Sequence, residues 1–234
     1  MEATRAPTAV DLENQYVLQN YARYPVVLQR GKGCYVYDTS GKRCLDLLAG
    51  IGVNALGHAH PRLTKVIREQ VGRLIHTSNL YYHEYAGPLA ERLSKASGLA
   101  RIFYCNSGAE ANETALKMAK AHGHAISPEK FEIVSLDNSF HGRTIGALSV
   151  TGQESYRRDF EPLMPGVRFV PRNDITALEQ MVCDRTAGII LELVQGEGGI
   201  YPFTEAYIRK ARELADQEGV EVRRTDRIMS CPVG

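Results

Sequence analysis

Short apolar runs alternate with helical patterns over the second half of the sequence. The runs that have the length of a buried strand are residues 101–105, 132–136, 167–170 and 188–193. The segments with the apolar spacing of a helix are residues 109–122, 175–182 and 204–217. This alternation predicts an α/β fold, a mostly parallel sheet with helices on both faces. Ligands of such folds bind at the carboxyl ends of the strands.

The first hundred residues have a different pattern, typical of a small antiparallel α+β segment. Their predicted strands are residues 26–29, 34–37 and 43–48, with a hairpin turn at 38–42. Their predicted helices are residues 9–22, 61–74 and 85–97. Pro61 opens the second of these helices, and one face of it carries Leu63, Val66, Ile67 and Val71.

Composition excludes several classes of protein. The 234 residues are 44% hydrophobic and carry a net charge of +1, which provides no basic field for nucleic acid. No apolar run approaches the roughly 20 residues that span a membrane, and residues 1–10 lack the core of a secretory signal. The scattered cysteines contain no C-x-x-C pair, so we expect neither structural zinc nor disulfides, and a cytoplasmic location.

The turn from residue 105 into the next helix has the features of a phosphate site. Ser107 is a good N-cap, and Glu110 three residues later completes a capping box. The exposed N–H groups of a helix start attract anions, and Gly108 allows an anion to approach the backbone. The alternative is a capped helix with no ligand.

Polar and aromatic residues also follow the next strands. Phe140 has a flat face for a heteroaromatic ring, and Arg143 has the geometry to bind a carboxylate; packing and solvation are the alternatives. Glu192 ends an apolar strand, where a carboxylate is costly unless paired, functional or exposed to solvent. Glu197 is a candidate gate that pairs with a substrate cation or with a protein arginine. His58 and His60 lie two residues apart without a third ligand nearby, which indicates loop histidines and no metal site.

Together these motifs resemble the class III pyridoxal-phosphate aminotransferases. The matching strings are Gly33-x-Tyr35-Val36-Tyr37-Asp38, Val53-Asn54-Ala55-Leu56-Gly57-His58-x-His60-Pro61, Asn106-Ser107-Gly108-Ala109-Glu110-Ala111-Asn112-Glu113, Ser139-Phe140-His141-Gly142-Arg143-Thr144 and Gln195-Gly196-Glu197-Gly198-Gly199. Residues 48–54 and 76–82 are most similar to the members that act on acetylornithine. The resemblance covers residues 20–220 and implies fold type I and transfer of an amino group to 2-oxoglutarate through pyridoxal 5'-phosphate.

The resemblance also implies roles for individual residues. The cofactor phosphate would be held by Ser107, Gly108 and Ala109. Phe140 would stack on the cofactor ring, with Glu192 near it. The implied substrate residues are Arg143 for the α-carboxylate, Glu197 as the gate, and Tyr24 and Asn79 at the entrance.

The family pattern implies residues that this sequence does not match. An Asp-Glu-x-Gln motif, whose aspartate pairs with the ring nitrogen, and the lysine that forms the Schiff base with the cofactor should follow residue 220. Neither is found, so we assign no catalytic residue and expect no transamination by this chain. The arginine-rich residues 221–234 suggest a truncated product whose tail arises from a frameshift or a premature stop, and which is poorly soluble or dependent on partner chains.

The expected division is an N-terminal segment of the small domain at 1–60, a partial cofactor-binding large domain at 61–220, and an aberrant tail at 221–234. Family members are expected to be homodimers. Alternatives to the acetylornithine activity are ornithine, succinylornithine or 4-aminobutyrate as amino donor, or a non-catalytic fragment that binds the cofactor or dimerises.

Overall fold

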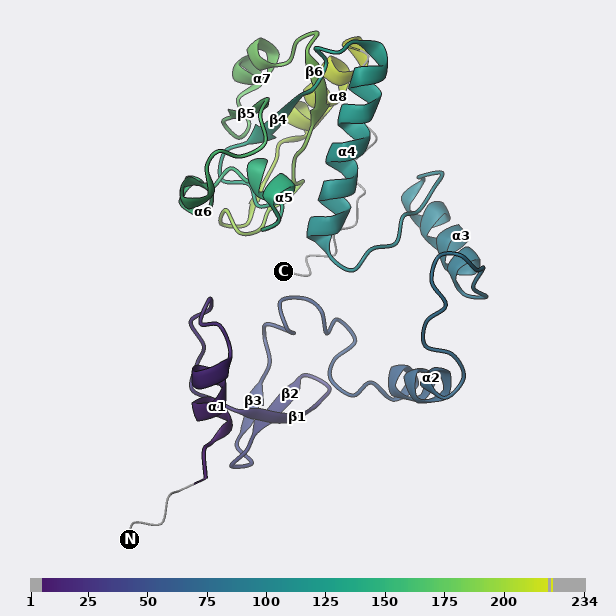
Figure 1. The fold of residues 1–234 in the computed structure, drawn as a ribbon, viewed down its shortest axis with the longest axis vertical. Helices are drawn as coiled ribbons and strands as arrows, with labels where there is room; N and C mark the ends of the chain where they lie inside the picture. The colour runs from purple at the N-terminus through teal and green to yellow at the C-terminus, as the bar shows by residue number, and fades with distance from the viewer. Residues whose placement is uncertain (1–5, 219, 221–234) are drawn as a thin grey trace. The chain divides into compact units, whose positions relative to one another are not determined.

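The computed structural model describes residues 6–218 and 220. The chain divides between Tyr82 and His83 into two compact units, which are described separately below (Figure 1). The predicted domain boundary at residue 60 stays a prediction, and the predicted tail at 221–234 lies outside the described residues.

The N-terminal unit contains a three-stranded antiparallel sheet in the order β1-β2-β3. Its elements are α1 (Ala9–Tyr16), β1 (Leu28–Lys32), β2 (Tyr35–Asp38), β3 (Arg43–Leu45) and α2 (Pro61–Val71). The helix predicted over 9–22 ends at Tyr16, because Val17 is extended and the Gln19 amide donates to the carbonyls of Glu13 and Val17. The strand predicted over 43–48 ends at Leu45, where the Asp46 carboxylate instead accepts from backbone N–H groups of the following turn.

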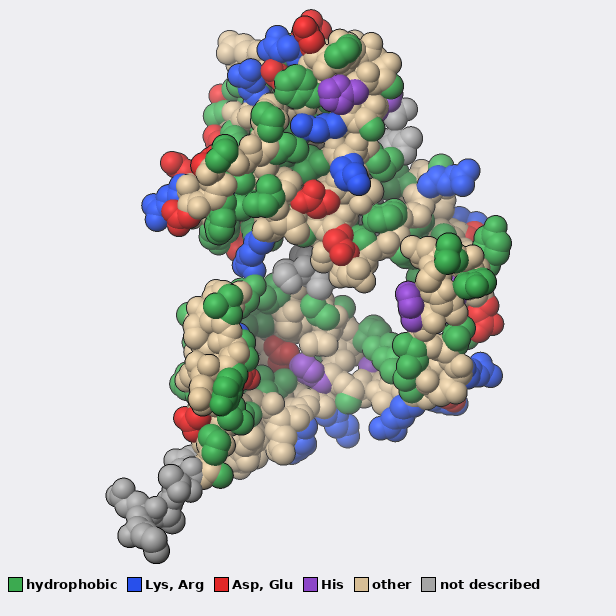
Figure 2. Space-filling model, viewed as in Figure 1, with side chains coloured by type: hydrophobic (Ala, Val, Ile, Leu, Met, Phe, Trp, Pro, Cys, Tyr) green, Lys and Arg blue, Asp and Glu red, His purple; other side chains and the backbone are tan. Residues whose placement is uncertain are grey.

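Apolar side chains of the N-terminal unit remain exposed. The predicted stripe on α2 is present, but Leu63, Val66, Ile67 and Val71 are between 46% and 59% exposed. Green side chains gather on the visible surface of these elements in Figure 2. No residue between 6 and 82 is classed as buried. The N-terminal unit by itself therefore does not cover the apolar face of α2.

The C-terminal unit is built on a parallel sheet in the order β5-β4-β6. The sheet strands are β4 (Glu132–Leu136), β5 (Val167–Val170) and β6 (Thr186–Ile189), and a small hairpin pairs β7 (Val194–Gln195) with β8 (Tyr201–Pro202). The helices are α3 (Ala86–Ser97), α4 (Gly108–Ile126), α5 (Ile145–Ser149), α6 (Glu154–Arg157), α7 (Ile175–Met181) and α8 (Glu205–Gln217), with a 3-10 turn at Arg158–Phe160.

Helices pack on both faces of this sheet, as predicted (Figure 1). Successive side chains of a strand point to opposite faces, so Val134 and Ile133 enter different clusters. Val134 packs with Leu178 of α7 and with residues of α8, whereas Ile133 packs with Leu116 of α4. Burial on both faces explains why every residue of β4 is buried.

The strand predicted at residues 101–105 was wrong. The segment forms no strand pairing among the described residues, and Phe103 and Tyr104 are 63% and 46% exposed. The Tyr104 hydroxyl donates to the carbonyl of Ala86 in α3, 2.8 Å away. A strand requires a neighbour for its N–H and C=O groups, and the described sheet gives this segment none. The apolar composition of residues 101–105 suggested a strand but did not show which strand it would pair with.

No helix within the described residues is long and apolar enough to cross a membrane.

Candidate functional site

The start of α4 has the geometry predicted for an anion site. Ser107 is the N-cap in an extended conformation, and its side-chain oxygen accepts from the N–H of Glu110 at 3.2 Å. The Glu110 carboxylate accepts in turn from the N–H of Asn106, which holds the pKa of Glu110 below its ordinary value. The first N–H groups of a helix have no partner inside it, so those of Gly108 and Ala109 remain available at this end. The Ser107 hydroxyl still has its own proton to donate.

The loop after β4 contains Phe140 and Arg143. Phe140 is half-buried, and its ring meets Tyr156 edge-on with centroids 6.2 Å apart. The guanidinium carbon of Arg143 lies 5.8 Å from the centroid of the Phe140 ring, within the range of a cation–π contact. The aromatic ring and the guanidinium predicted to contact a ligand are thus neighbours in the structure.

Glu192, which follows β6, connects its own loop to the loop after β4. Its carboxylate accepts from the backbone N–H of Phe140 at 2.9 Å and from that of Gly196 at 3.3 Å. Burial raises the pKa of Glu192, and the charge of Glu197 adds to that shift, while the two N–H groups oppose it. The buried Gln195 side chain donates to the carbonyl of Asp137 at 2.8 Å. These contacts join the two strand ends.

The same loop packs closely against the start of α4. Gly142 has φ +133°, and a Cβ added to it would lie 2.8 Å from the Cβ of Ala109. The Asn112 amide donates to the carbonyl of His141 at 2.7 Å. The anion site of α4 and the loop that carries Phe140 therefore belong to one packed structure.

Sequence reasoning assigned no role to several residues that hold this loop. Asn112 and Glu113 lie inside the matched motif, and Thr151 accepts from the N–H of His141 at 3.0 Å. A signal for Asn112 existed, because it lies four residues before Leu116 on the apolar side of α4. A polar residue at an inward position of a helix must find a hydrogen-bond partner in the fold.

His141 is buried in this loop, and burial lowers its pKa to about 4. Its Nε2 atom has no hydrogen-bond partner among the described residues. The imidazole is therefore neutral near neutral pH.

Other predicted residues lie in the N-terminal unit. Tyr24 is 88% exposed, and Asn79 is also exposed. Their predicted place at a substrate entrance stays a prediction. His58 pairs with Asp46 at 2.7 Å, and this hydrogen bond lowers the pKa of Asp46. Among the described residues, no group of three or more His, Cys, Asp or Glu side chains is arranged for a metal.

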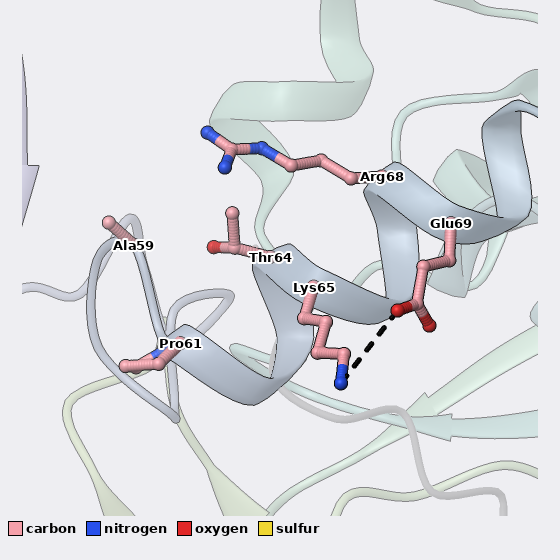
Figure 3. A pocket seen from close by; sticks show the side chains of 6 residues that line it. All are labelled: Ala59, Pro61, Thr64, Lys65, Arg68 and Glu69. Carbon is pink, nitrogen blue, oxygen red and sulfur yellow. Dashed lines mark ion pairs between the residues drawn. The ribbon is translucent and has the colours of Figure 1, made fainter.

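An open hollow of about 560 Å³ lies at the start of α2 (Figure 3). Its lining residues are Ala59, Pro61, Thr64, Lys65, Arg68 and Glu69. Lys65 and Glu69 form an exposed ion pair at 3.8 Å, which contributes little to stability. The hollow contains none of the residues that the sequence predicted for a site.

Taken together, the C-terminal unit offers three kinds of recognition. Backbone N–H groups and a hydroxyl at the start of α4 suit a phosphate. The Phe140 ring suits a flat aromatic ligand, and Arg143 suits a carboxylate. All come from strand ends or helix starts at one edge of an α/β sheet, where ligands of this class of fold bind.

Comparison with known proteins identifies the family. Residues 16–222 match the aminotransferase class-III family, so the chain belongs to the class III aminotransferases. The chain has the fold type I architecture, which it shares with the solved aminotransferase structures described next.

Its relatives include enzymes named for acetylornithine. The chain is 49% identical over 212 residues to an acetylornithine aminotransferase of Methanocaldococcus jannaschii, covering 90% of this chain and 53% of that protein. The N-acetylornithine aminotransferase structure from Stenotrophomonas maltophilia K279a is similar with a TM-score of 0.73 and 38% identity, covering 90% of this chain and 51% of that one.

An ornithine aminotransferase structure from Toxoplasma gondii is similar with a TM-score of 0.83 and 33% identity, covering 89% of this chain and 50% of that one. The description of that structure reports partial occupancy of PLP at its active site. The chain thus spans about half the length of the relatives it matches.

Proposed function

We propose that this chain is part of a pyridoxal-phosphate aminotransferase that moves an amino group from N-acetylornithine to 2-oxoglutarate. The proposal places the enzyme in arginine biosynthesis, in the cytoplasm, and as a homodimer. Its main support is the 49% identity to a protein of that name over 212 residues. The phosphate, ring and carboxylate partners at one edge of the sheet agree with it.

The residues present fit the cofactor. Ser107, Gly108 and Ala109 would hold its phosphate through the hydroxyl and the N–H groups at the start of α4. Phe140 would lie against the ring. When bound, the cofactor supplies an electron sink that stabilises negative charge beside the reacting carbon.

Arg143 and Glu197 would bind and orient the substrates. Arg143 would pair with the α-carboxylate. Glu192 would hold the backbone of Phe140 in place through its accepted hydrogen bond at 2.9 Å. Glu197, which is exposed, would pair with a cationic group or release it when an acidic substrate enters.

A chain of these 234 residues is expected to be inactive by itself. No lysine in it lies in a sequence context that matches the cofactor-binding lysine of the family, and no residue matches the aspartate that would keep the ring nitrogen protonated.

The exposed apolar face of α2 supports the proposal of a homodimer, because a partner chain could cover it.

Two alternatives have support of their own. The similarity to the ornithine aminotransferase of Toxoplasma gondii, with a TM-score of 0.83, favours ornithine among the alternative donors, which also include succinylornithine and 4-aminobutyrate. A non-catalytic fragment that binds the cofactor or dimerises is the second alternative, because no lysine among these 234 residues matches the Schiff-base lysine of the family.

An absorbance titration with pyridoxal 5'-phosphate separates an active enzyme from a non-catalytic fragment that binds the cofactor. We expect weak, reversible binding that inorganic phosphate competes away, and no glutamate from N-acetylornithine and 2-oxoglutarate. Borohydride trapping at one specific lysine, together with glutamate formation, would contradict the expected inactivity. Absence of phosphate-competed binding would contradict the cofactor site itself.

A further inference from the structure

The motif that begins α4 extends beyond the residues assigned to the phosphate. Asn112 and Glu113 follow one turn later and are half-buried. Neither has a role in the proposed function, and both contact the loop that carries Phe140 and Arg143.

Glu113 holds the part of the loop that leads into α5. One oxygen of its carboxylate accepts from the Thr144 hydroxyl at 2.5 Å and from the N–H of Ala147 at 3.1 Å. A Cβ added to Gly146, in the first turn of α5, would lie 2.3 Å from the other oxygen, so this carboxylate occupies the space beside the glycine. Hydrogen bonds to a charged acceptor are the stronger kind.

Asn112 holds the loop one step earlier. Its amide donates to the carbonyl of His141 at 2.7 Å, beside the contact between Gly142 and Ala109. Glu192 holds the N–H of Phe140 from the side of β6. The backbone on either side of the Phe140 ring is thus fixed by side chains of two different elements.

We propose that Asn112 and Glu113 are positioning residues, which set the distance between the phosphate site of α4 and the ring and carboxylate partners Phe140 and Arg143. The inference rests on the proposed function, since it deepens the same site. A ligand with both a phosphate and a ring gains from both partners only if their spacing is fixed before it binds. A phosphate alone needs only the start of α4.

This difference allows a selective test on the full 234-residue chain. Pyridoxamine 5'-phosphate is the probe, because it has the ring and the phosphate but no aldehyde to react with surface lysines. Its affinity is compared with that of inorganic phosphate by calorimetry. The variant E113A removes the acceptor, and E129Q, at an exposed turn before β4, is the matched control.

We expect E113A to lose about tenfold of its affinity for pyridoxamine 5'-phosphate, the equivalent of one charge-assisted hydrogen bond, while its affinity for phosphate is unchanged. The control should keep both affinities. Equal loss of both affinities in a folded E113A would indicate a general structural role and overturn the inference. An unchanged preference, meaning the ratio of the affinity for pyridoxamine 5'-phosphate to that for inorganic phosphate, would also overturn it.

Further variants keep the test decisive if E113A does not fold. T144V removes one hydroxyl bonded to Glu113, and N112L removes the donor to His141 with little change of shape. Each should lower the preference for pyridoxamine 5'-phosphate, and T144V should accelerate amide exchange at Ala147 without any ligand. If both the preference for pyridoxamine 5'-phosphate and the amide exchange at Ala147 are unchanged, the inference is overturned while the proposed function stands. Failure of the unaltered chain to bind either probe would instead refute the proposed function, and the inference with it.

Discussion

The contact between Gly142 and Ala109 gives a sharp prediction for the substitution G142A. A Cβ at position 142 would meet the Cβ of Ala109 at 2.8 Å and that of Ala147 at 3.0 Å, closer than real Cβ contacts allow. Overpacking of this kind costs about 1–3 kcal/mol. The residue also has φ +133°, where a side chain adds about 1–2 kcal/mol. The free energy of unfolding should therefore fall by about 2–5 kcal/mol.

Urea unfolding followed by far-UV circular dichroism measures this loss. G196A is the matched control, because a Cβ at Gly196, in the turn between β7 and β8, meets nothing within 4 Å and the backbone there has no positive φ. The control should be neutral or up to about 1 kcal/mol more stable than the unaltered chain. If G142A and G196A unfold at the same urea concentration, the close packing of the loop on α4 is refuted.

Further substitutions probe the cap, the sheet and the core. S107A removes the N-cap acceptor, so the same urea assay should show a loss of about 1 kcal/mol, and calorimetry should show weaker phosphate binding. Burial alone would raise the pKa of Glu132. The hydrogen bonds and charges of Arg168 and Arg185 together lower it by more, so the net shift is downward. The stability contributed by this carboxylate is present above its ordinary pKa of 4.5 and disappears as pH falls through the lowered folded value; E132Q should lack that part of the acid dependence in unfolding curves. The buried Tyr207 hydroxyl has no partner among the described residues, so Y207F should raise the free energy of unfolding by about 1 kcal/mol, and a lower value would contradict the unpaired hydroxyl.

The sequence predicted β4, which is buried throughout, and β5 with their observed bounds, whereas the strand predicted at residues 188–193 is β6 at Thr186–Ile189. The helix over residues 109–122 was also correct, with an N-cap at Ser107, although the helix continues to Ile126. The strand at 101–105 was wrong, because apolar composition does not identify a pairing partner. Pairing depends on backbone groups elsewhere in the chain, which a local pattern does not contain.

The site could be predicted in part. The motifs identified Phe140 and Glu192 as residues at strand ends, and the structure joins them by a hydrogen bond of 2.9 Å. The contacts of Asn112 and Glu113 with residues about thirty positions later were not predictable, because they depend on how α4 packs on the sheet. The ligand roles of the predicted residues stay predictions.

Binding of a pyridoxal-type phosphate by the start of α4 together with the loop after β4 can be measured by calorimetry. The chain is titrated with pyridoxamine 5'-phosphate and with pyridoxamine, which lacks the phosphate. We expect binding of the phosphorylated compound, competition by inorganic phosphate, and much weaker binding of pyridoxamine. Equal binding of the two compounds, or binding that phosphate does not displace, would contradict this expectation.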